Sequence, residues 1–323
     1  MTTVLKCVLL LSGVFGLWSC ARQRRETASD APAPRAFELP HIPVALVTPE
    51  SRIDYLTAHY WDNFDFADTT LISKPEITEQ VFADFIDLLT GLPAQTADSA
   101  LTRMITASAA DSAMFAHFAD LSEKYLYDPN SPLRDEELYI PILRYLADSP
   151  HLDSLSKLRP RHQLELALKN RPGDIAADFI YTLASGKRDR MSHIGADYTI
   201  LFFNNPDCGD CSHVKEYMDA SPAIGGQLRR QCEPGKTAAG SDGRDLAVLA
   251  LYPEGDVSRW RETKYPAGMI NAYDAGEKIA AGQSYDLKAM PTLYLLDKDK
   301  RVILKDASVE RIEQWLINEK QAK

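Results

Sequence analysis

The spacing of apolar residues changes near residue 170, and this change limits the possible folds more than any other feature of the sequence. From about Pro49 to Asn170, apolar side chains recur every three or four residues, which is the period of an amphipathic helix. After Pro172, short β-branched and aromatic runs alternate with helical stretches. We therefore expect an all-α helical domain over residues 44–170 and an α/β domain over residues 171–323.

Local patterns place individual elements in both parts of the chain. Prolines separate about six helical segments in the first part. The apolar stripes and helices expected there cover residues 77–89, 101–105, 114–125, 136–147 and 161–169. In the second part we expect strands at residues 198–203, 246–252, 292–296 and 301–304, and helices after Cys208, over 274–281 and over 309–318.

The charge balance restricts the classes of partner. The chain has 36 Lys and Arg residues against 46 Asp and Glu residues, a net charge of −10, so it has no basic excess to neutralise a phosphate backbone. Nucleic acid is therefore not expected as a partner. The sequence also lacks His-Glu-x-x-His or a comparable ligand spacing, so we expect no metal site and no cofactor.

The first residues have the features of an export signal. Lys6 is followed by an apolar run, Cys7 to Trp18, that is shorter than the ~20 residues of a membrane-spanning helix. The run leads into Leu17-Trp18-Ser19-Cys20, which resembles the lipobox of bacterial lipoproteins. The resemblance implies removal of residues 1–19 and lipidation of Cys20, with residues 20–43 as a flexible tether. A plain signal peptide with an incidental cysteine is the alternative.

A Cys-x-x-Cys pair carries the chemistry of the second part. Cys208 follows the expected strand 198–203 and begins a helix, whose N-terminus favours a thiolate. Such a thiolate attacks a disulfide, and Cys211, one turn further on, resolves the mixed disulfide. A zinc site or a structural disulfide are the alternatives, but zinc needs four ligands and so short a loop gives little stability. Cys232 is expected to be an incidental thiol, or a reactive one because basic residues precede it.

Residues 171–323 contain Pro172-Gly173-Asp174, Asp178-Phe179, Gly186-Lys187, Cys208-Gly209-Asp210-Cys211, the strand LAVLALY, Met290-Pro291-Thr292 and the hairpin LYLLDKDKRVIL. With these motifs the segment resembles the TlpA-like thioredoxin family of thiol–disulfide oxidoreductases. The resemblance implies a thioredoxin-like domain, a central mixed sheet flanked by helices, in which a cis peptide bond at Pro291 faces the cysteine pair. It also implies that Met290 and Thr292 present backbone groups to an extended substrate. Residues 44–170 resemble a domain of unknown function found before such domains in bacterial lipoproteins.

The chain departs from this family at the positions that handle protons. Phe202 stands where thioredoxins have a buried acid, and Val214 stands where some TlpA-like members have a glutamate. Glu216 or His213 could accept the proton of Cys211, but neither matches by position. The general base is therefore left unassigned.

Two carboxylates next to the first cysteine bear on the direction of the reaction. Asp207 replaces the expected aromatic residue before Cys208, and Asp210 lies between the cysteines. Their negative charges oppose a thiolate on Cys208. A less stabilised thiolate favours a protein that acts as a reductant.

We expect a membrane-anchored thiol–disulfide oxidoreductase that reduces disulfides of exported proteins. The resemblance implies a membrane electron donor, and the absence of an acidic residue directly after Cys20 favours the periplasmic face of the outer membrane. A thiol peroxidase is one alternative, although Asn205 stands where a peroxiredoxin would have threonine. A binding module built on a redox fold is the other. Replacement of Cys208 by serine should abolish function if the protein is either enzyme and should spare it if the protein is a binding module.

Overall fold

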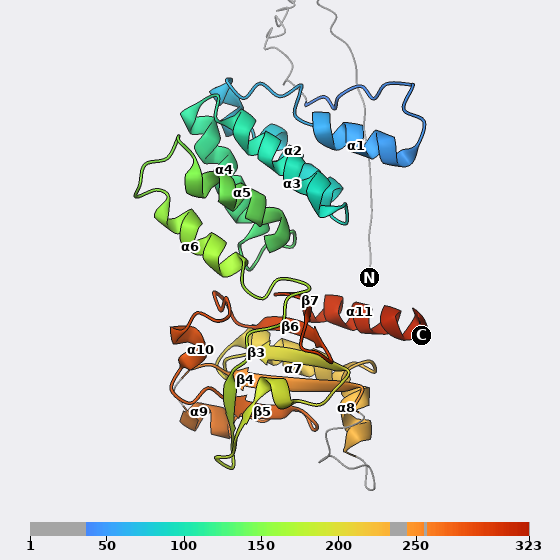
Figure 1. The fold of residues 1–323 in the computed structure, drawn as a ribbon, viewed down its shortest axis with the longest axis vertical. Coiled ribbons are helices and arrows are strands. Elements are labelled where there is room, and N and C mark those ends of the chain that lie inside the picture. The colour runs from blue at the N-terminus through green and yellow to red at the C-terminus, as the bar shows by residue number, and fades with distance from the viewer. Residues whose placement is uncertain (1–36, 233–243, 255–256, 323) are drawn as a thin grey trace, which may run out of the picture. The chain divides into compact units, whose positions relative to one another are not determined.

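The structure, a computed structural model, describes residues 37–232, 244–254 and 257–322, which form a helical region followed by an α/β region (Figure 1). The predicted signal peptide, the lipidation site at Cys20 and most of the predicted tether lie outside the described residues. Among the described residues, no helix has both the length and the apolar character needed to span a membrane.

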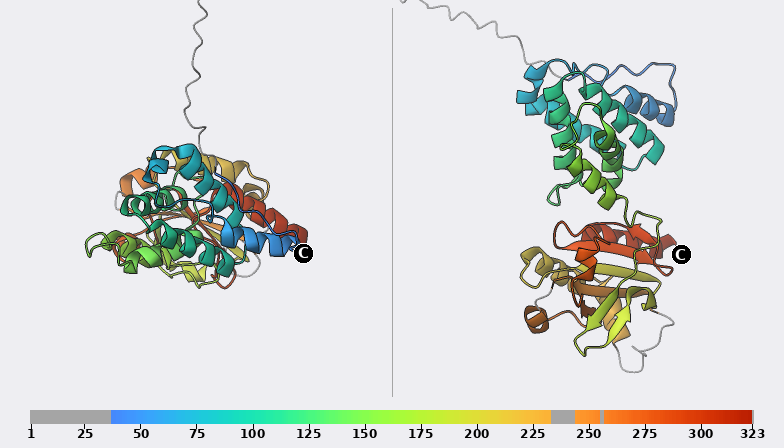
Figure 2. Two further views of the ribbon diagram at one scale, coloured as in Figure 1. Left: turned by 90° about the horizontal axis from the view of Figure 1, so that it is seen from above. Right: turned by 60° about the vertical axis from the view of Figure 1, so that its left-hand side comes forward.

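The helical region consists of helices joined by short loops, drawn in blue to green in Figures 1 and 2. Acidic N-caps begin two of its helices. The Asp111 carboxylate accepts the backbone N–H of Ala113 at 2.8 Å, and Asp135 caps the next helix in the same way. The elements are α1 (Pro49–His59), η1 (Thr69–Ser73), α2 (Pro75–Leu89), α3 (Ala94–Ser108), α4 (Ser112–Leu126), α5 (Glu136–Asp148) and α6 (Leu158–Ala167).

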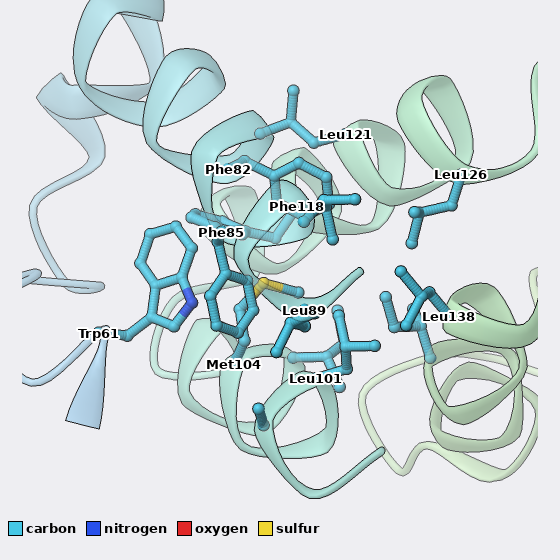
Figure 3. Close-up of a cluster of buried hydrophobic side chains, with 14 of the residues drawn as sticks. Trp61, Phe82, Phe85, Leu89, Leu101, Met104, Phe118, Leu121, Leu126 and Leu138 are labelled. Carbon is cyan, nitrogen blue, oxygen red and sulfur yellow. The ribbon is translucent and has the colours of Figure 1, made fainter. Parts of the chain in front are cut away.

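An aromatic cluster forms the centre of the helical core (Figure 3). The Trp61 ring lies 5.4 Å from that of Phe85 and 5.3 Å from that of Phe118, both edge to face. Phe118 is fully buried. Phe37 also packs against this cluster, with its ring 5.9 Å from that of Trp61. The packed region therefore includes a residue that the sequence assigned to the tether.

The α/β region is built on a mixed sheet of seven strands in the order β2-β1-β5-β4-β3-β6-β7. Strands β3, β4 and β5 run parallel, whereas β6 pairs with β3 in the antiparallel sense. The strands are β1 (Ile180–Leu183), β2 (Arg188–Arg190), β3 (Tyr198–Phe203), β4 (Leu246–Tyr252), β5 (Ile270–Tyr273), β6 (Thr292–Asp297) and β7 (Val302–Leu304).

The central strands bury both of their faces, because successive side chains enter different cores. In β3, Leu201 and Phe203 join one cluster, while Ile200 and Phe202 join the other. Helices α7, α8 and α11 contribute to the second cluster, whereas residues around β1, η2 and α10 contribute to the first. The helical elements are η2 (Met191–His193), α7 (Gly209–Ala220), α8 (Gly225–Gln231), α9 (Val257–Glu262), α10 (Lys278–Ala281) and α11 (Val309–Ala322).

Some elements differ from the sequence-based expectation. The helix predicted over residues 274–281 is shortened to α10, because the Asp274 carboxylate accepts the N–H of Ile279 at 2.7 Å and Glu277 adopts a left-handed conformation. Strands β1, β2 and β5 and helices α8 and α9 were not predicted.

Candidate functional site

Strand register brings the two sequence motifs of the second part together. The last residue of β3, Phe203, pairs with the first residue of β6, Thr292, in the antiparallel β3–β6 ladder. The segment that follows β3 and the loop that precedes β6 must therefore emerge at the same edge of the sheet. The first segment carries Cys208, and the loop carries Met290 and Pro291.

Cys208 is the N-cap of α7. Its Sγ accepts the backbone N–H of Cys211 at 3.1 Å, as an N-cap side chain does, and its S–H donates to the carbonyl of Met290 at 3.3 Å. The peptide bond between Met290 and Pro291 is cis. The partly buried Cys208 sulfur therefore lies between a helix N-terminus, which stabilises a thiolate, and the loop expected to receive substrate.

Cys211 is fully buried, which separates its role from that of Cys208. Burial, followed by the hydrogen bond with Cys208, raises the pKa of the Cys211 thiol to about 12. A single backbone donor, the N–H of Asn205 at 3.5 Å, acts in the opposite direction. Cys211 therefore stays protonated at neutral pH, so Cys208 is the thiol suited to the first attack.

A polar network that was not predicted lies beside Cys211. The hydroxyl of Tyr265 donates to Asn204 Oδ1 at 2.7 Å, and the Lys215 ammonium lies 5.0 Å from the Tyr265 ring centre. Burial and then the neighbouring Cys211 raise the pKa of Tyr265. Nothing local in the sequence marks Tyr265, because it meets Asn204 only through the fold.

The sequence-based candidates for a general base lie elsewhere. The His213 side chain is 79% exposed and lies 3.9 Å from the carboxylate of Asp210. Glu216 is exposed as well, and Phe202 is fully buried in the core. The position of neither exposed residue supports a role at buried Cys211.

The structure modifies the argument about the two acidic neighbours of Cys208. Asp207 forms an ion pair with Arg259 of α9, so part of its negative charge is compensated. Asp210 is highly exposed, and water screens its charge. The two carboxylates therefore oppose a Cys208 thiolate less strongly than their sequence positions imply.

The remaining predicted residues take separate places. The Thr292 hydroxyl donates to the carbonyl of Ala289 at 2.7 Å, which links the start of β6 to the preceding loop. Cys232 is the exposed C-cap of α8, and it is free, like Cys208 and Cys211. Within the described ranges, no group of three or more His, Cys, Asp or Glu residues could hold a metal ion.

Comparison with protein families identifies the first part of the chain. Residues 19–170 match a family described as a domain of unknown function (DUF5106). No curated protein matches the chain.

Solved structures resemble the chain over different lengths. A thioredoxin-like protein from Bacteroides caccae is 44% identical, covers 88% of this chain and 99% of its own, and superposes with a TM-score of 0.80. The C-terminal domain of an uncharacterized protein from Bacteroides fragilis is 38% identical, covers 46% of this chain and 98% of its own, and has a TM-score of 0.41. The match to the first of these proteins extends over both regions, and the chain therefore belongs to the thioredoxin-like proteins, with a DUF5106 region at its N-terminal side.

Proposed function

We propose that this chain is a thiol–disulfide oxidoreductase that reduces disulfides in exported proteins. One observation carries the proposal: the Cys208 sulfur accepts a helix N-terminal N–H at 3.1 Å and lies 3.3 Å from the carbonyl next to cis Pro291. A nucleophile and a loop with an available backbone acceptor are thus adjacent. When Cys208 loses its proton, the Met290 carbonyl can accept a hydrogen bond from an extended substrate instead.

The reaction uses the two cysteines in sequence. The Cys208 thiolate attacks one sulfur of the substrate disulfide, so a Cys208–substrate bond forms as the substrate S–S bond breaks. The released substrate sulfur takes up a proton. Cys211 then gives up its proton and attacks Cys208, which releases the second substrate thiol and leaves a Cys208–Cys211 disulfide. The substrate gains two electrons and two protons, and the dithiol of this chain loses them.

The reductive direction requires an electron donor of the dithiol class that restores the two thiols. Asp207 and Asp210 give this direction modest support, because negative charge near Cys208 favours the disulfide form of the chain over the thiolate, although Arg259 and solvent weaken the effect. A membrane reductase fits the proposed place of the protein, which is anchored by lipid on Cys20 and faces the periplasm from the outer membrane. Replacement of Cys20 by serine should then move the protein from the membrane fraction to the soluble fraction.

The reduction potential of the Cys208–Cys211 couple tests the activity. Equilibration with glutathione or dithiothreitol buffers should give a value near that of thioredoxin, ~−270 mV. A value near ~−120 mV would assign the chain as an oxidant and overturn the reductive direction. If Cys208 and Cys211 formed no reversible dithiol–disulfide couple, the proposed redox activity would be wrong.

A further inference from the structure

The loop that ends at cis Pro291 is held by residues from outside the α/β region. Residues 282–291 join α10 to β6 and contain neither helix nor strand. The Lys169 ammonium donates to the carbonyl of Gln283 at 3.0 Å, and the Asn170 amide donates to that of Ser284 at 2.7 Å. These contacts come from the segment that directly follows α6. They fix the start of the loop, whereas a different set of contacts fixes the part next to Pro291.

Five buried or largely buried charged residues, here called the ion cluster, join the loop to the start of α5. They are Glu136, Asp286, Lys288, Lys305 and Asp306. The Lys288 ammonium lies 2.6 Å from Glu136 Oε1, 3.2 Å from Asp286 Oδ2 and 3.5 Å from Asp306 Oδ2. Lys305 lies 2.8 Å from the second oxygen of Glu136. Glu136 thus binds a lysine of the loop with one oxygen and a lysine beyond β7 with the other.

A tyrosine of the helical region completes the contacts around Lys288. The Tyr127 hydroxyl donates to Asp286 Oδ2 at 3.2 Å, and the Lys288 ammonium lies 4.0 Å from the centre of the Tyr127 ring. Lys288 therefore contacts the helical region through both a carboxylate and an aromatic face. These two contacts leave the side chain little freedom to move without breaking one of them.

Burial makes this arrangement difficult to lose one group at a time. The Glu136 side chain is 6% exposed and that of Lys288 is 14% exposed. Burial opposes the charge on Glu136, but Lys288 and Lys305 outweigh it and hold the pKa of Glu136 below its usual range. Burial likewise opposes the charge on Lys288, and the surrounding carboxylates, Glu136 first, outweigh it and raise the pKa of Lys288. Each charge depends on its partners, so removal of one leaves another buried and uncompensated.

We propose that the helical region positions the substrate loop of the redox site, with Glu136 as the positioning residue that acts through Lys288. Lys288 lies two residues before Met290, whose carbonyl contacts Cys208. The inference rests on the proposed function, because the loop has a role only if substrates bind there. It assigns a role in substrate binding to a region that carries none of the cysteine chemistry.

A neighbouring ion pair supplies a matched control. Glu137 follows Glu136 on α5 and pairs with Arg171, with 2.5 Å between Glu137 Oε2 and Arg171 Nη2. Arg171 lies in the connection between the regions and not in the loop before Pro291. Glu137→Gln therefore removes the same charge from the same helix turn without releasing Lys288.

The experiment compares two substrates in the full chain and in the Glu136→Gln and Glu137→Gln variants. A peptide with one disulfide reports binding along the loop, and dithiobis-nitrobenzoate reports the reactivity of Cys208 alone. Glu136→Gln should raise KM for the peptide by ~10-fold or more, because small displacements of a positioning group have large effects. Its reduction potential and its rate with dithiobis-nitrobenzoate should stay at the wild-type values. Glu137→Gln should change none of these quantities.

A second variant approaches the cluster from the loop. Lys288→Met keeps the apolar stem of the side chain and leaves Glu136 paired with Lys305, but it takes the lysine partner from Asp286, so denaturant unfolding must show that the variant is folded before KM is compared. It should reproduce the KM effect of Glu136→Gln, whereas Lys288→Arg, which keeps the charge, should restore most of the affinity.

Separate results would overturn the inference and the proposed function. Equal KM values in Glu136→Gln, Lys288→Met and wild type would remove the positioning role while leaving the reductase intact. A change in reduction potential that equals the change in KM, when both are expressed as free energies, would show that the cluster acts on the cysteines and not on the loop. If the wild-type chain reduced neither substrate, the proposed function itself would fail.

Discussion

The two regions of the molecule bury their apolar residues in different ways. The helical region has one core, centred on the rings around Trp61 and Phe118. The α/β region has two cores, one on each face of the sheet, and the cysteine pair lies where β3 ends. Cys211 belongs to one of these cores, whereas Cys208 is only partly buried. The α/β region thus places a reactive cysteine pair at the boundary of one of its cores, whereas the core of the helical region consists of packed apolar side chains.

Replacement of Cys208 gives the sharpest test that chemistry is confined to the α/β region. Cys208→Ser should lower the rate of peptide disulfide reduction by ~10³-fold or more, because no other described group replaces the nucleophile. Cys232→Ser, which removes the exposed thiol at the end of α8, should leave the rate unchanged. Reduction at the wild-type rate in Cys208→Ser would show that Cys208 is not the nucleophile and would overturn the mechanism proposed above.

Truncation of one phenylalanine in each region should separate packing from chemistry. Phe118→Ala and Phe202→Ala both remove a fully buried ring, so each should lower the free energy of unfolding by ~3–5 kcal/mol. Only Phe202 shares a core with Cys211, so only Phe202→Ala should also shift the reduction potential. Denaturant unfolding and redox equilibration measure the two effects. A shift in Phe118→Ala would show that the regions are not distinct in this respect.

The fold class was predictable because periodicity is a local property. The predicted order of an all-α region followed by a thioredoxin-like α/β region is confirmed. The missed strands lack a pattern of their own: β2 consists of Arg188, Asp189 and Arg190, which form a strand because they pair with β1. Strand β5 has only four residues and is defined by its pairing with β4 and β1. Such strands depend on partners that the local sequence does not reveal.

The candidate site was predictable only where its residues lie close together in the sequence. Cys208 and Cys211 are three positions apart, and their place after a strand indicates their chemistry. Lys288 gives no such signal, because a lysine in a polar loop is usually exposed, and its partner Glu136 lies 152 residues away. Tyr265 is similar, because Asn204 lies 61 residues before it.

The pH dependence of Cys211 alkylation measures how far the resolving thiol is buried in the α/β core. Its pKa is raised to about 12, so the thiol is neutral at pH 7 and its thiolate fraction grows ~10-fold per pH unit below that value. In Cys208→Ser, burial remains as the largest cause of the shift. The rate of Cys211 alkylation in that variant, followed by mass spectrometry, should therefore still increase with pH, by ~10³-fold in total between pH 7 and pH 10. Glutathione in the same buffers corrects for the reagent, and a plateau near pH 8 would contradict the buried position.

The smallest expected effect concerns the exposed ion pair at the edge of the site, because solvent-exposed charges interact weakly. Asp207 and Arg259 are 59% and 55% exposed, so their ion pair contributes ~1 kcal/mol at most. Arg259→Gln leaves the Asp207 charge less compensated, which disfavours the Cys208 thiolate and should make the reduction potential more negative by ~20 mV at most. Asp207→Asn removes that charge and should shift the potential in the positive direction.

Two controls distinguish the effect of the Asp207–Arg259 ion pair from an effect of net charge: the variant Arg261→Gln and the dependence of the reduction potential on ionic strength. Arg261→Gln removes the same charge from α9, but the ion pair with Asp207 is made by Arg259. It should therefore shift the potential less than Arg259→Gln does. Because exposed charges are screened, the shift in Arg259→Gln should shrink as ionic strength rises. If the reduction potential of Arg259→Gln shifted in the positive direction, or if salt left its shift unchanged, Asp207 would act on Cys208 through a buried contact. The contrast between an exposed ion pair at the edge of the site and a buried resolving thiol would then no longer hold.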